Sequence, residues 1–203
     1  MEQKDEPKQK LPDTRTRILL AARDIFTEEG YDRATTRRIA QEANVNEVTL
    51  YRHFGNKENL FISVVNEFSA VFKLSEMKAI NLRGEPYEDL VILGTLLYES
   101  LTERHKEVLT LLCESNRNEF IKDVMVKIPQ QLQGVYASFF SQHIKAGNFV
   151  EDDPNVLATA FMGMFFSLTI FKNFLGGEVS HDLNDISIVE KYVRIFLKGI
   201  QNQ

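Results

Sequence analysis

The sequence contains a single cysteine and no tryptophan, and each shortage excludes a kind of site. Cys113 has no second cysteine with which to form an internal disulfide or to hold a zinc ion. A reducing cytoplasm is therefore the expected location, and we predict no metal and no other cofactor. Without tryptophan, an aromatic cage for a quaternary ammonium ligand is not expected. The four histidines show no metal-ligand spacing; they are His53, His105, His143 and His181.

The sequence also lacks the local motifs of common enzyme classes. It has no glycine-rich phosphate loop, no nucleophile elbow, and no carboxylate pair that periodicity would place in one cleft. We therefore predict that the protein is not an enzyme and has no catalytic residues. An enzyme whose active site assembles from distant positions leaves no such motif, so it stays as a less favoured alternative.

Charge is distributed unevenly along the chain. The net charge is −5, but between Arg33 and Lys57 five basic residues stand against two acidic ones, a local +3. Residues 58–203 carry the acidic excess. A basic patch on an acidic body suits a protein that contacts phosphates at one end only, although an excess of this size is also common on solvated helices.

Apolar residues recur at helical spacing along the whole chain, and no segment alternates with a period of two. The predicted fold class is therefore all-α. Gly30, Gly55, Gly147 and the pair Gly176-Gly177 are expected to end helices. The expected helices cover about 13–29, 36 to a turn at 44, 46–53, 57–73, 86–102, 106–116, 119–146 with a kink at Pro129, 154–175 and 185–200.

The segment from Thr35 to Leu60, TTRRIAQEANVNEVTLYRHFGNKENL, combines two short helices, a tight turn and the start of a third helix. Its pattern from Ile39 onward, I-A-x-x-A-x-V-x-x-x-T-L-Y-x-H-F-x-x-K-E-x-L, resembles the DNA-binding domain of the TetR (tetracycline-repressor-like) regulators. The resemblance implies a three-helix helix-turn-helix head on a larger all-helical body that binds an effector and dimerises. We expect a flexible arm over 1–12, the head over 13–72 with the motif at about 35–54, and the body over 73–203. Because the opening stretch, MEQKDEPKQKLPD, is polar, no secretory signal is expected.

The resemblance also implies roles for individual residues. Phosphate contacts set the register of a protein on DNA, whereas contacts with base edges carry the sequence information. The implied phosphate-binding residues are Thr36, Tyr51, His53 and Lys57. The residues implied to reach base edges, or to lie beside them on the recognition helix, are Arg37, Asn46, Glu47, Val48, Thr49 and Arg52. An arginine suits guanine, Glu47 the amino group of cytosine, and Val48 the methyl group of thymine.

Several residues of this motif allow more than one interpretation. Asn44 stands where the family usually has a turn glycine, although asparagine also tolerates a left-handed conformation. Glu47 either reads cytosine or pairs with Arg38 or Arg52. Thr35 or Thr36 is expected to cap the second helix, and Thr36 is expected both to cap through its side chain and to approach a phosphate through its amide. The core of the three-helix unit is expected to include Val45, Val48, Leu50 and Phe54.

The body contains an uncharged run from Val156 to Phe171. At about 1.5 Å per residue it reaches about 24 Å, short of a hydrocarbon core of about 30 Å, so a membrane span is not expected. In the resembling family, the last two long helices of each subunit form a dimer interface. The residues expected there are Phe161, Phe165, Leu168, Val193, Phe196 and Leu197, with Ala160, Gly163 and Ser167 allowing close approach.

We expect the body to bind a small, largely apolar effector, because phenylalanine and methionine are abundant. The polar candidates for its pocket are Tyr98, Asn116, Tyr136 and His143, although each also fits an ordinary core or surface position. The whole pattern predicts a homodimeric repressor that leaves a palindromic operator in double-stranded DNA when the effector binds. A transcriptional activator with the same head, or a dimeric small-molecule-binding protein without a DNA partner, is the alternative.

Overall fold

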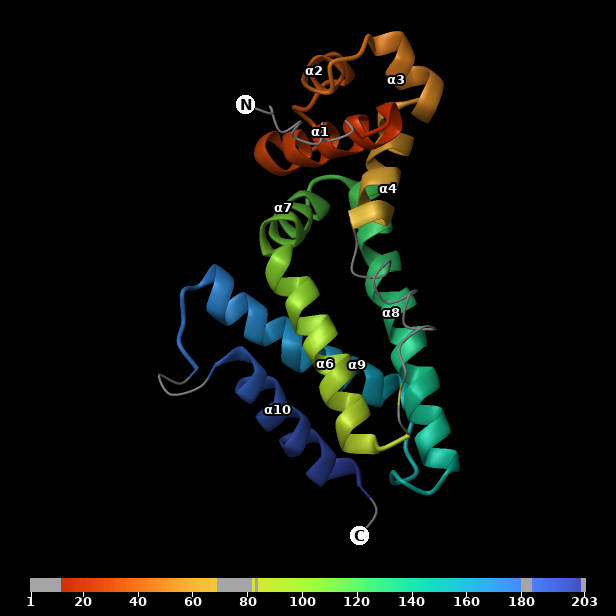
Figure 1. The fold of residues 1–203 in the computed structure, drawn as a ribbon, viewed down its shortest axis with the longest axis vertical. Helices are drawn as coiled ribbons and strands as arrows, with labels where there is room; N and C mark the ends of the chain where they lie inside the picture. Colours follow the sequence, from red (N-terminus) through yellow and green to blue (C-terminus); the bar gives the residue numbers. More distant parts are fainter. Residues whose placement is uncertain (1–11, 69–81, 83, 180–183, 202–203) are drawn as a thin grey trace, which may run out of the picture. The chain divides into compact units, whose positions relative to one another are not determined.

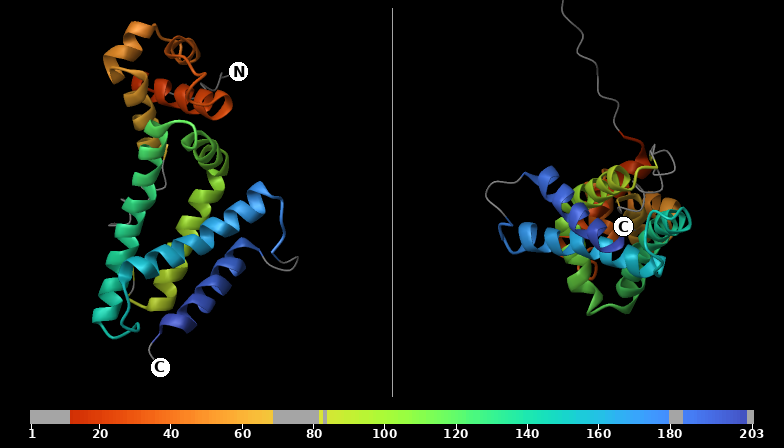
Figure 2. Two further views of the ribbon diagram at one scale, coloured as in Figure 1. Left: turned by 180° about the vertical axis from the view of Figure 1, so that it is seen from behind. Right: turned by 90° about the horizontal axis from the view of Figure 1, so that it is seen from below.

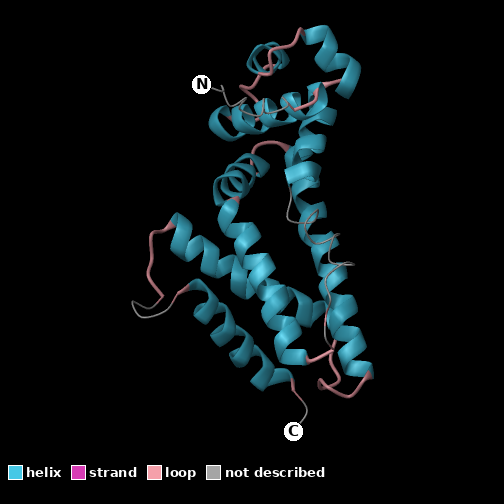
Figure 3. Cartoon of the chain, in the orientation of Figure 1, coloured by secondary structure: helices cyan, strands magenta, loops and turns pink. Residues whose placement is uncertain are grey.

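The computed structural model describes residues 12–68, 82, 84–179 and 184–201. These residues form helices joined by loops (Figure 3), and the extended backbone among them pairs only in one isolated bridge, Phe149 with Gln201. The predicted all-α class is confirmed. The chain divides into two compact units, residues 1–67 and 68–203. The boundary predicted after residue 72 lies outside the described residues.

The first unit, here called the head, contains four helices whose bounds follow from local capping signals. Asp13 precedes the first helix and accepts hydrogen bonds from the amides of Arg15 and Thr16. Gly30 ends that helix with a φ of 79°, a conformation that glycine adopts without a steric cost. The helices are α1 (Thr14–Glu29), α2 (Thr36–Glu42), α3 (Glu47–Phe54) and α4 (Lys57–Phe68).

Apolar residues from all four helices meet in one core in the head. Phe26 and Phe61 pack edge to face with ring centroids 5.2 Å apart, and Tyr31 lies 5.0 Å from Phe61. Ile39 of α2 and Leu50 of α3 are also fully buried. This core fixes the angle between α2 and α3, so the exposed residues of α3 project from a rigid support.

The second unit, here called the body, contains the remaining described helices (Figure 1). Their bounds lie within one residue of the predicted ones, except that the helix predicted over 154–175 ends at Thr169 and continues as a π-helical turn, Ile170–Phe174. The π-helical turn leads from this helix toward the glycine pair at 176–177. Pro129 lies inside the eighth helix, which therefore lacks one backbone hydrogen bond there. The elements are α6 (Pro86–Glu103), α7 (His105–Ser115), α8 (Glu119–Lys145), α9 (Pro154–Thr169), η2 (Ile170–Phe174) and α10 (Asp185–Ile200).

Phenylalanine rings fill the centre of the body. Phe161 of α9 is fully buried and lies within 6.0 Å, centroid to centroid, of Phe140, Phe165 and Phe196. Seen from behind, α9 crosses α6 (Figure 2). A Cβ atom added to Gly94 of α6 would lie 2.7 Å from the Phe165 ring, so only glycine allows this close approach.

Candidate nucleic-acid interface

The turn between α2 and α3 is built from local hydrogen bonds. Thr35 caps α2 by accepting a hydrogen bond from the Arg38 amide at 3.2 Å, so the first of the two predicted caps is confirmed and the capping role predicted for the Thr36 side chain is wrong. Asn44 has a φ of 52° and fills the left-handed turn position in place of glycine, as expected. Asn46 caps α3, and its Oδ1 atom accepts from both the amide and the hydroxyl of Thr49. The side-chain nitrogen of Asn46, Nδ2, has no hydrogen-bond partner among the described residues and can donate to an outside partner.

The recognition helix α3 has one buried side and one exposed side. Leu50 and Phe54 are buried in the head core, as expected. Val48, in contrast, is 76% exposed, so its predicted place in the core is wrong and its predicted place on the outer face fits. An apolar side chain with this exposure gains no burial within the head. Tyr51, Arg52 and His53 are also exposed.

Two of the basic residues near the turn have no ion-pair or hydrogen-bond partner among the described residues. Arg37, at the start of α2, and Arg52, on α3, are exposed and form no ion pair or hydrogen bond with the described part of the chain. Arg38 instead pairs with Glu29, with Nε 2.6 Å from Oε1. The alternative in which Glu47 pairs with Arg38 or Arg52 is therefore wrong. Two free guanidinium groups provide the forked donor geometry that suits a guanine edge or a phosphate.

Glu47 takes part in a hydrogen-bonded chain that joins α2 to α3. The Thr36 hydroxyl donates to Glu47 Oε1 at 2.5 Å, and the same hydroxyl lies 3.1 Å from the Tyr51 hydroxyl. Sequence reasoning missed this chain, because Thr36 and Tyr51 are fifteen residues apart and only the packing of α2 on α3 brings them together.

Lys57 lies at the first turn of α4 over the ring of Tyr31, with its Nζ atom 4.3 Å from the ring centroid. The same atom donates to the Asp32 carbonyl at 3.4 Å. These contacts hold the ammonium beside the N-terminus of α4, where the helix dipole also favours an anion. Its phosphate contact stays a prediction.

The four pocket candidates of the body separate in the structure. Tyr136 is buried, which raises the pKa of its hydroxyl, and this hydroxyl donates to the Leu93 carbonyl. Burial lowers the pKa of His143, and a weaker attraction to Asp89 opposes that shift. Asn116 is exposed beyond the end of α7. These three candidates therefore do not line the cavity described next.

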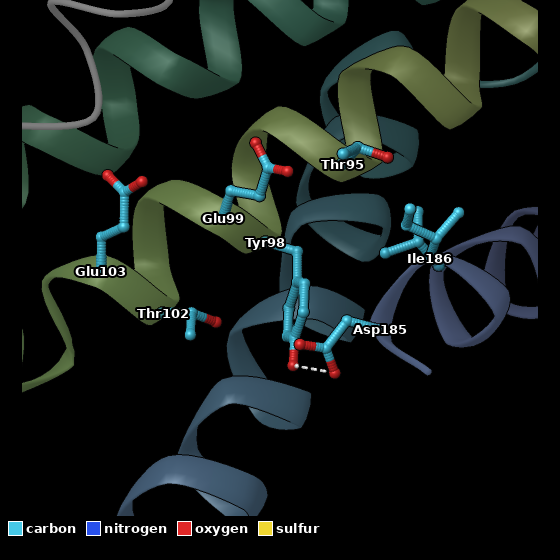
Figure 4. A pocket seen from close by; sticks show the side chains of 8 residues that line it. Thr95, Tyr98, Glu99, Thr102, Glu103, Asp185 and Ile186 are labelled. Carbon is cyan, nitrogen blue, oxygen red and sulfur yellow. Dashed lines mark hydrogen bonds between the residues drawn. The ribbon is translucent and has the colours of Figure 1, made fainter. Parts of the chain in front are cut away.

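Tyr98 does line a cavity, of about 310 Å³, between α6 and α10. Figure 4 shows the Tyr98 hydroxyl and the Asp185 carboxylate meeting between the two helices, at a distance of 3.3 Å. Asp185 also accepts from Lys172, which raises the pKa of that lysine. The lining mixes carboxylates, hydroxyls and aliphatic groups: Thr95, Tyr98, Glu99, Thr102, Glu103, Asp185, Ile186 and Val189. Its volume is at the lower end for small-molecule sites.

The residues predicted for a subunit interface face inward instead. A side chain in an interface must be exposed on the free protomer. Five of the predicted residues are at most 5% exposed, so the prediction is wrong for them. The sixth, Phe196, packs against the same core. The five are Phe161, Phe165, Leu168, Val193 and Leu197. The small residues Ala160, Gly163 and Ser167 are exposed on the outer side of α9.

The outer sides of α9, η2 and α10 are nevertheless apolar. Val156 is 57% exposed, Phe174 56%, and Ile195 67%. Residues 154–174 together are long and apolar enough to cross a membrane by length and composition, and 33% of their most apolar window is buried within the protomer. The rest of this apolar window is not buried within the protomer.

Comparison with known proteins agrees with this geometry. Residues 18–64 match the family described as bacterial regulatory proteins, tetR family. The uncharacterized HTH-type transcriptional regulator YvkB of Bacillus subtilis is 27% identical over 191 residues, which cover 92% of this chain and 97% of YvkB. The HTH-type transcriptional repressor NicS of Pseudomonas putida is 33% identical over 106 residues, or 52% of this chain and 50% of NicS.

The fold of the whole chain is also found in solved structures. The transcriptional regulator FadR from Bacillus subtilis, in complex with stearoyl-CoA, superposes with a TM-score of 0.73 at 19% identity, covering 92% of this chain and 99% of FadR. The matched residues 18–64 contain α2, the turn and α3, where the exposed donors were located above. Residues 18–64 therefore form a helix-turn-helix domain of the kind found in the bacterial regulatory proteins of the tetR family, and the chain as a whole is similar to HTH-type transcriptional regulators such as YvkB.

Proposed function

We propose that the protein is a homodimeric, cytoplasmic repressor that binds a palindromic operator and leaves it when a small ligand binds the body. The observation that carries the DNA-binding part is the outer face of α2 and α3. Arg37 and Arg52 are exposed without partners in the described chain, and Val48 stands exposed beside them. A face that combines free forked donors with one apolar group matches the edges of bases in the major groove.

A single recognition helix reads only a few base pairs, so the mechanism requires two copies. In a two-fold dimer, two heads meet half-sites about one turn of DNA apart, which makes the operator a palindrome. The proposed dimer surface is the outer side of α9 with Ile195 of α10. Gly163 supports this, because a Cβ atom added there would meet no atom of its own protomer within 4 Å, leaving space for a partner helix.

The second part of the proposal is the response to a ligand. FadR from Bacillus subtilis holds stearoyl-CoA, so a body with this fold can bind a molecule with a long apolar part. In the present chain the cavity beside Tyr98 combines aliphatic surface from Ile186 and Val189 with carboxylates. We therefore propose a small ligand with an apolar part and a polar or basic group. We propose repression rather than activation because the relative NicS is a transcriptional repressor.

Selection of duplexes from a random pool by the purified protein tests the DNA-binding function directly. The expected product is a palindrome, and its affinity is expected to fall steeply with salt because phosphate contacts release counterions. A protein that retains no duplex, or whose affinity is flat between 50 and 200 mM salt (roughly the range over which such complexes weaken), is not a DNA-binding repressor.

The dimer is tested by Ile195→Glu, which places a charge on the proposed interface. We expect the variant to be monomeric by sedimentation and to lose operator binding while keeping its helical content. Val126→Glu is the matched control, because Val126 is 46% exposed and lies on another helix, α8, that is not part of the proposed surface. Equal behaviour of the two variants would rule out this interface.

A further inference from the structure

The hydrogen-bonded chain of Glu47, Thr36 and Tyr51 has a fixed direction. At neutral pH a glutamate carboxylate only accepts hydrogen bonds, so the proton between Glu47 and Thr36 comes from the Thr36 hydroxyl. A threonine hydroxyl has one proton. The contact of 3.1 Å between Thr36 and Tyr51 must therefore use the Tyr51 proton, with Thr36 accepting. Both hydroxyl protons point toward Glu47.

This direction limits what Tyr51 offers to DNA. Its ring is 44% exposed on the outer face of α3, and its hydroxyl keeps only acceptor lone pairs for an outside partner. A phosphate oxygen is also an acceptor, so the two do not form a hydrogen bond while the chain is intact. In the major groove, hydrogen-bond donors are the exocyclic amino groups of cytosine and adenine.

We infer that Tyr51 is a specificity-determining residue that accepts a hydrogen bond from a cytosine or adenine amino group, and that Glu47 and Thr36 are positioning residues that set its proton direction. This inference rests on the proposed DNA-binding function and deepens it. It replaces the phosphate contact expected for Tyr51 and the direct reading of cytosine expected for Glu47. The carboxylate is needed because it supplies the fixed acceptor at the end of the chain.

Two variants test the inference in duplex selection with the full-length protein. Tyr51→Phe removes the acceptor, so the preference for cytosine or adenine at one position of each half-site is expected to drop by about 2- to 13-fold, the range for one net hydrogen bond. Thr36→Val removes the acceptor that holds the Tyr51 proton. Tyr51 is then able to donate, and the preference at the same position is expected to move toward guanine or thymine, which present acceptors.

Two further variants complete the experiment. In Thr36→Val/Tyr51→Phe the selected base at that position is expected to equal that of Tyr51→Phe alone, because the only route from Thr36 to the base is the Tyr51 hydroxyl. Thr27→Val is the matched control; the Thr27 hydroxyl donates to the Arg23 carbonyl of its own helix α1. This variant loses a hydroxyl of the same kind and is expected to select the wild-type operator.

The outcomes separate the inference from the function on which it rests. If the wild type selects no duplex, the DNA-binding function itself fails. If the wild type selects a palindrome and Tyr51→Phe weakens every duplex by one common factor, Tyr51 contacts the backbone and the inference is overturned. Should Tyr51→Phe lose its helical circular dichroism, Thr36→Val alone decides, and an unchanged base preference at every position overturns the inference.

Discussion

The head and the body expose different kinds of side chain, and the difference reflects what each unit contacts. In the described part of the head, the large apolar residues with substantial exposure are Val48 and Tyr51, both on the recognition helix. Around them lie arginine, histidine and asparagine side chains. In the body, exposed valine, phenylalanine and isoleucine follow the outer sides of α9, η2 and α10.

Exposed polar and exposed apolar side chains differ in the free-energy cost of their hydration and in the partners that they suit. Exposed arginines stay hydrated until they meet an acceptor, so they suit a contact that forms and dissolves. A broad apolar surface is disfavoured in water and suits a lasting contact. This difference fits the proposed function, in which the head meets a reversible partner, DNA, and the body meets a lasting partner, a second copy of the chain.

The largest expected effect separates the inner from the outer side of α9. Phe161→Ala removes a fully buried ring and should lower the free energy of unfolding by about 3–5 kcal/mol, as for other buried phenylalanines. Phe166→Ala, on the same helix but 39% exposed, should leave protomer stability nearly unchanged and weaken dimerisation. Denaturant unfolding of each variant, together with sedimentation, measures both effects. Similar losses of unfolding free energy in the two variants would contradict the assignment of the two sides.

A smaller effect is expected in the head and divides base contacts from phosphate contacts. Arg37→Ala should cost about 1–3 kcal/mol on the preferred operator and relax the choice at one base pair. Lys57→Ala should weaken all duplexes about equally and reduce the slope of log affinity against log salt by about one. Titration of matched and mismatched duplexes at several salt concentrations measures both. Sequence-blind losses of the same size from both variants would show that Arg37 does not reach a base.

The smallest effect concerns pH and lies in the body alone. Because burial lowers the pKa of His143, the folded protein takes up this proton less readily than the unfolded chain. The stabilising contribution is present above the ordinary histidine value of about 6.5 and is lost as pH falls through the window below it. Asn148 favours the neutral ring, because its amide nitrogen lies 3.0 Å from His143 Nδ1.

Denaturant midpoints measured between about pH 8 and pH 5 check this expectation against the ordinary histidine value. The wild type should lose more stability on acidification than His143→Gln, which has no proton to take up. Parallel pH profiles for the two proteins would mean that His143 does not couple folding to pH. Operator affinity corrected for the folded fraction should not differ between them.

Sequence reasoning succeeded where the determining signals are local. Asp13, Asn46 and Asn184 cap their helices with their own side chains, and Gly147 follows α8 with a φ of 78°. Such signals act over a few residues, which is why helix bounds and the recognition helix were predicted closely. The fixed spacing of the head motif added the roles of exposed residues, which composition does not supply.

The same reasoning failed where a side chain's direction depends on distant packing. On a helix that is apolar all round, such as α9, periodicity does not tell which side meets the protomer and which meets a partner. Phe165 faces inward because Gly94, seventy-one positions earlier, leaves room for its ring. The hydroxyl chain from Thr36 to Tyr51 likewise depends on how α2 and α3 cross. These are properties of the folded chain rather than of any short segment.

The close approach at Gly94 also affects how movement passes through the body. Because the Phe165 ring of α9 packs directly against the Gly94 backbone of α6, the two helices are expected to tilt together as a single strut rather than slide past each other. One side of that strut lines the cavity through Tyr98 and Glu99, while the other carries the exposed face of α9. A molecule that wedges α6 outward would therefore change the crossing angle between two subunits without any intermediate element. Adjustment elsewhere is then expected in α7, in which no side chain is fully buried.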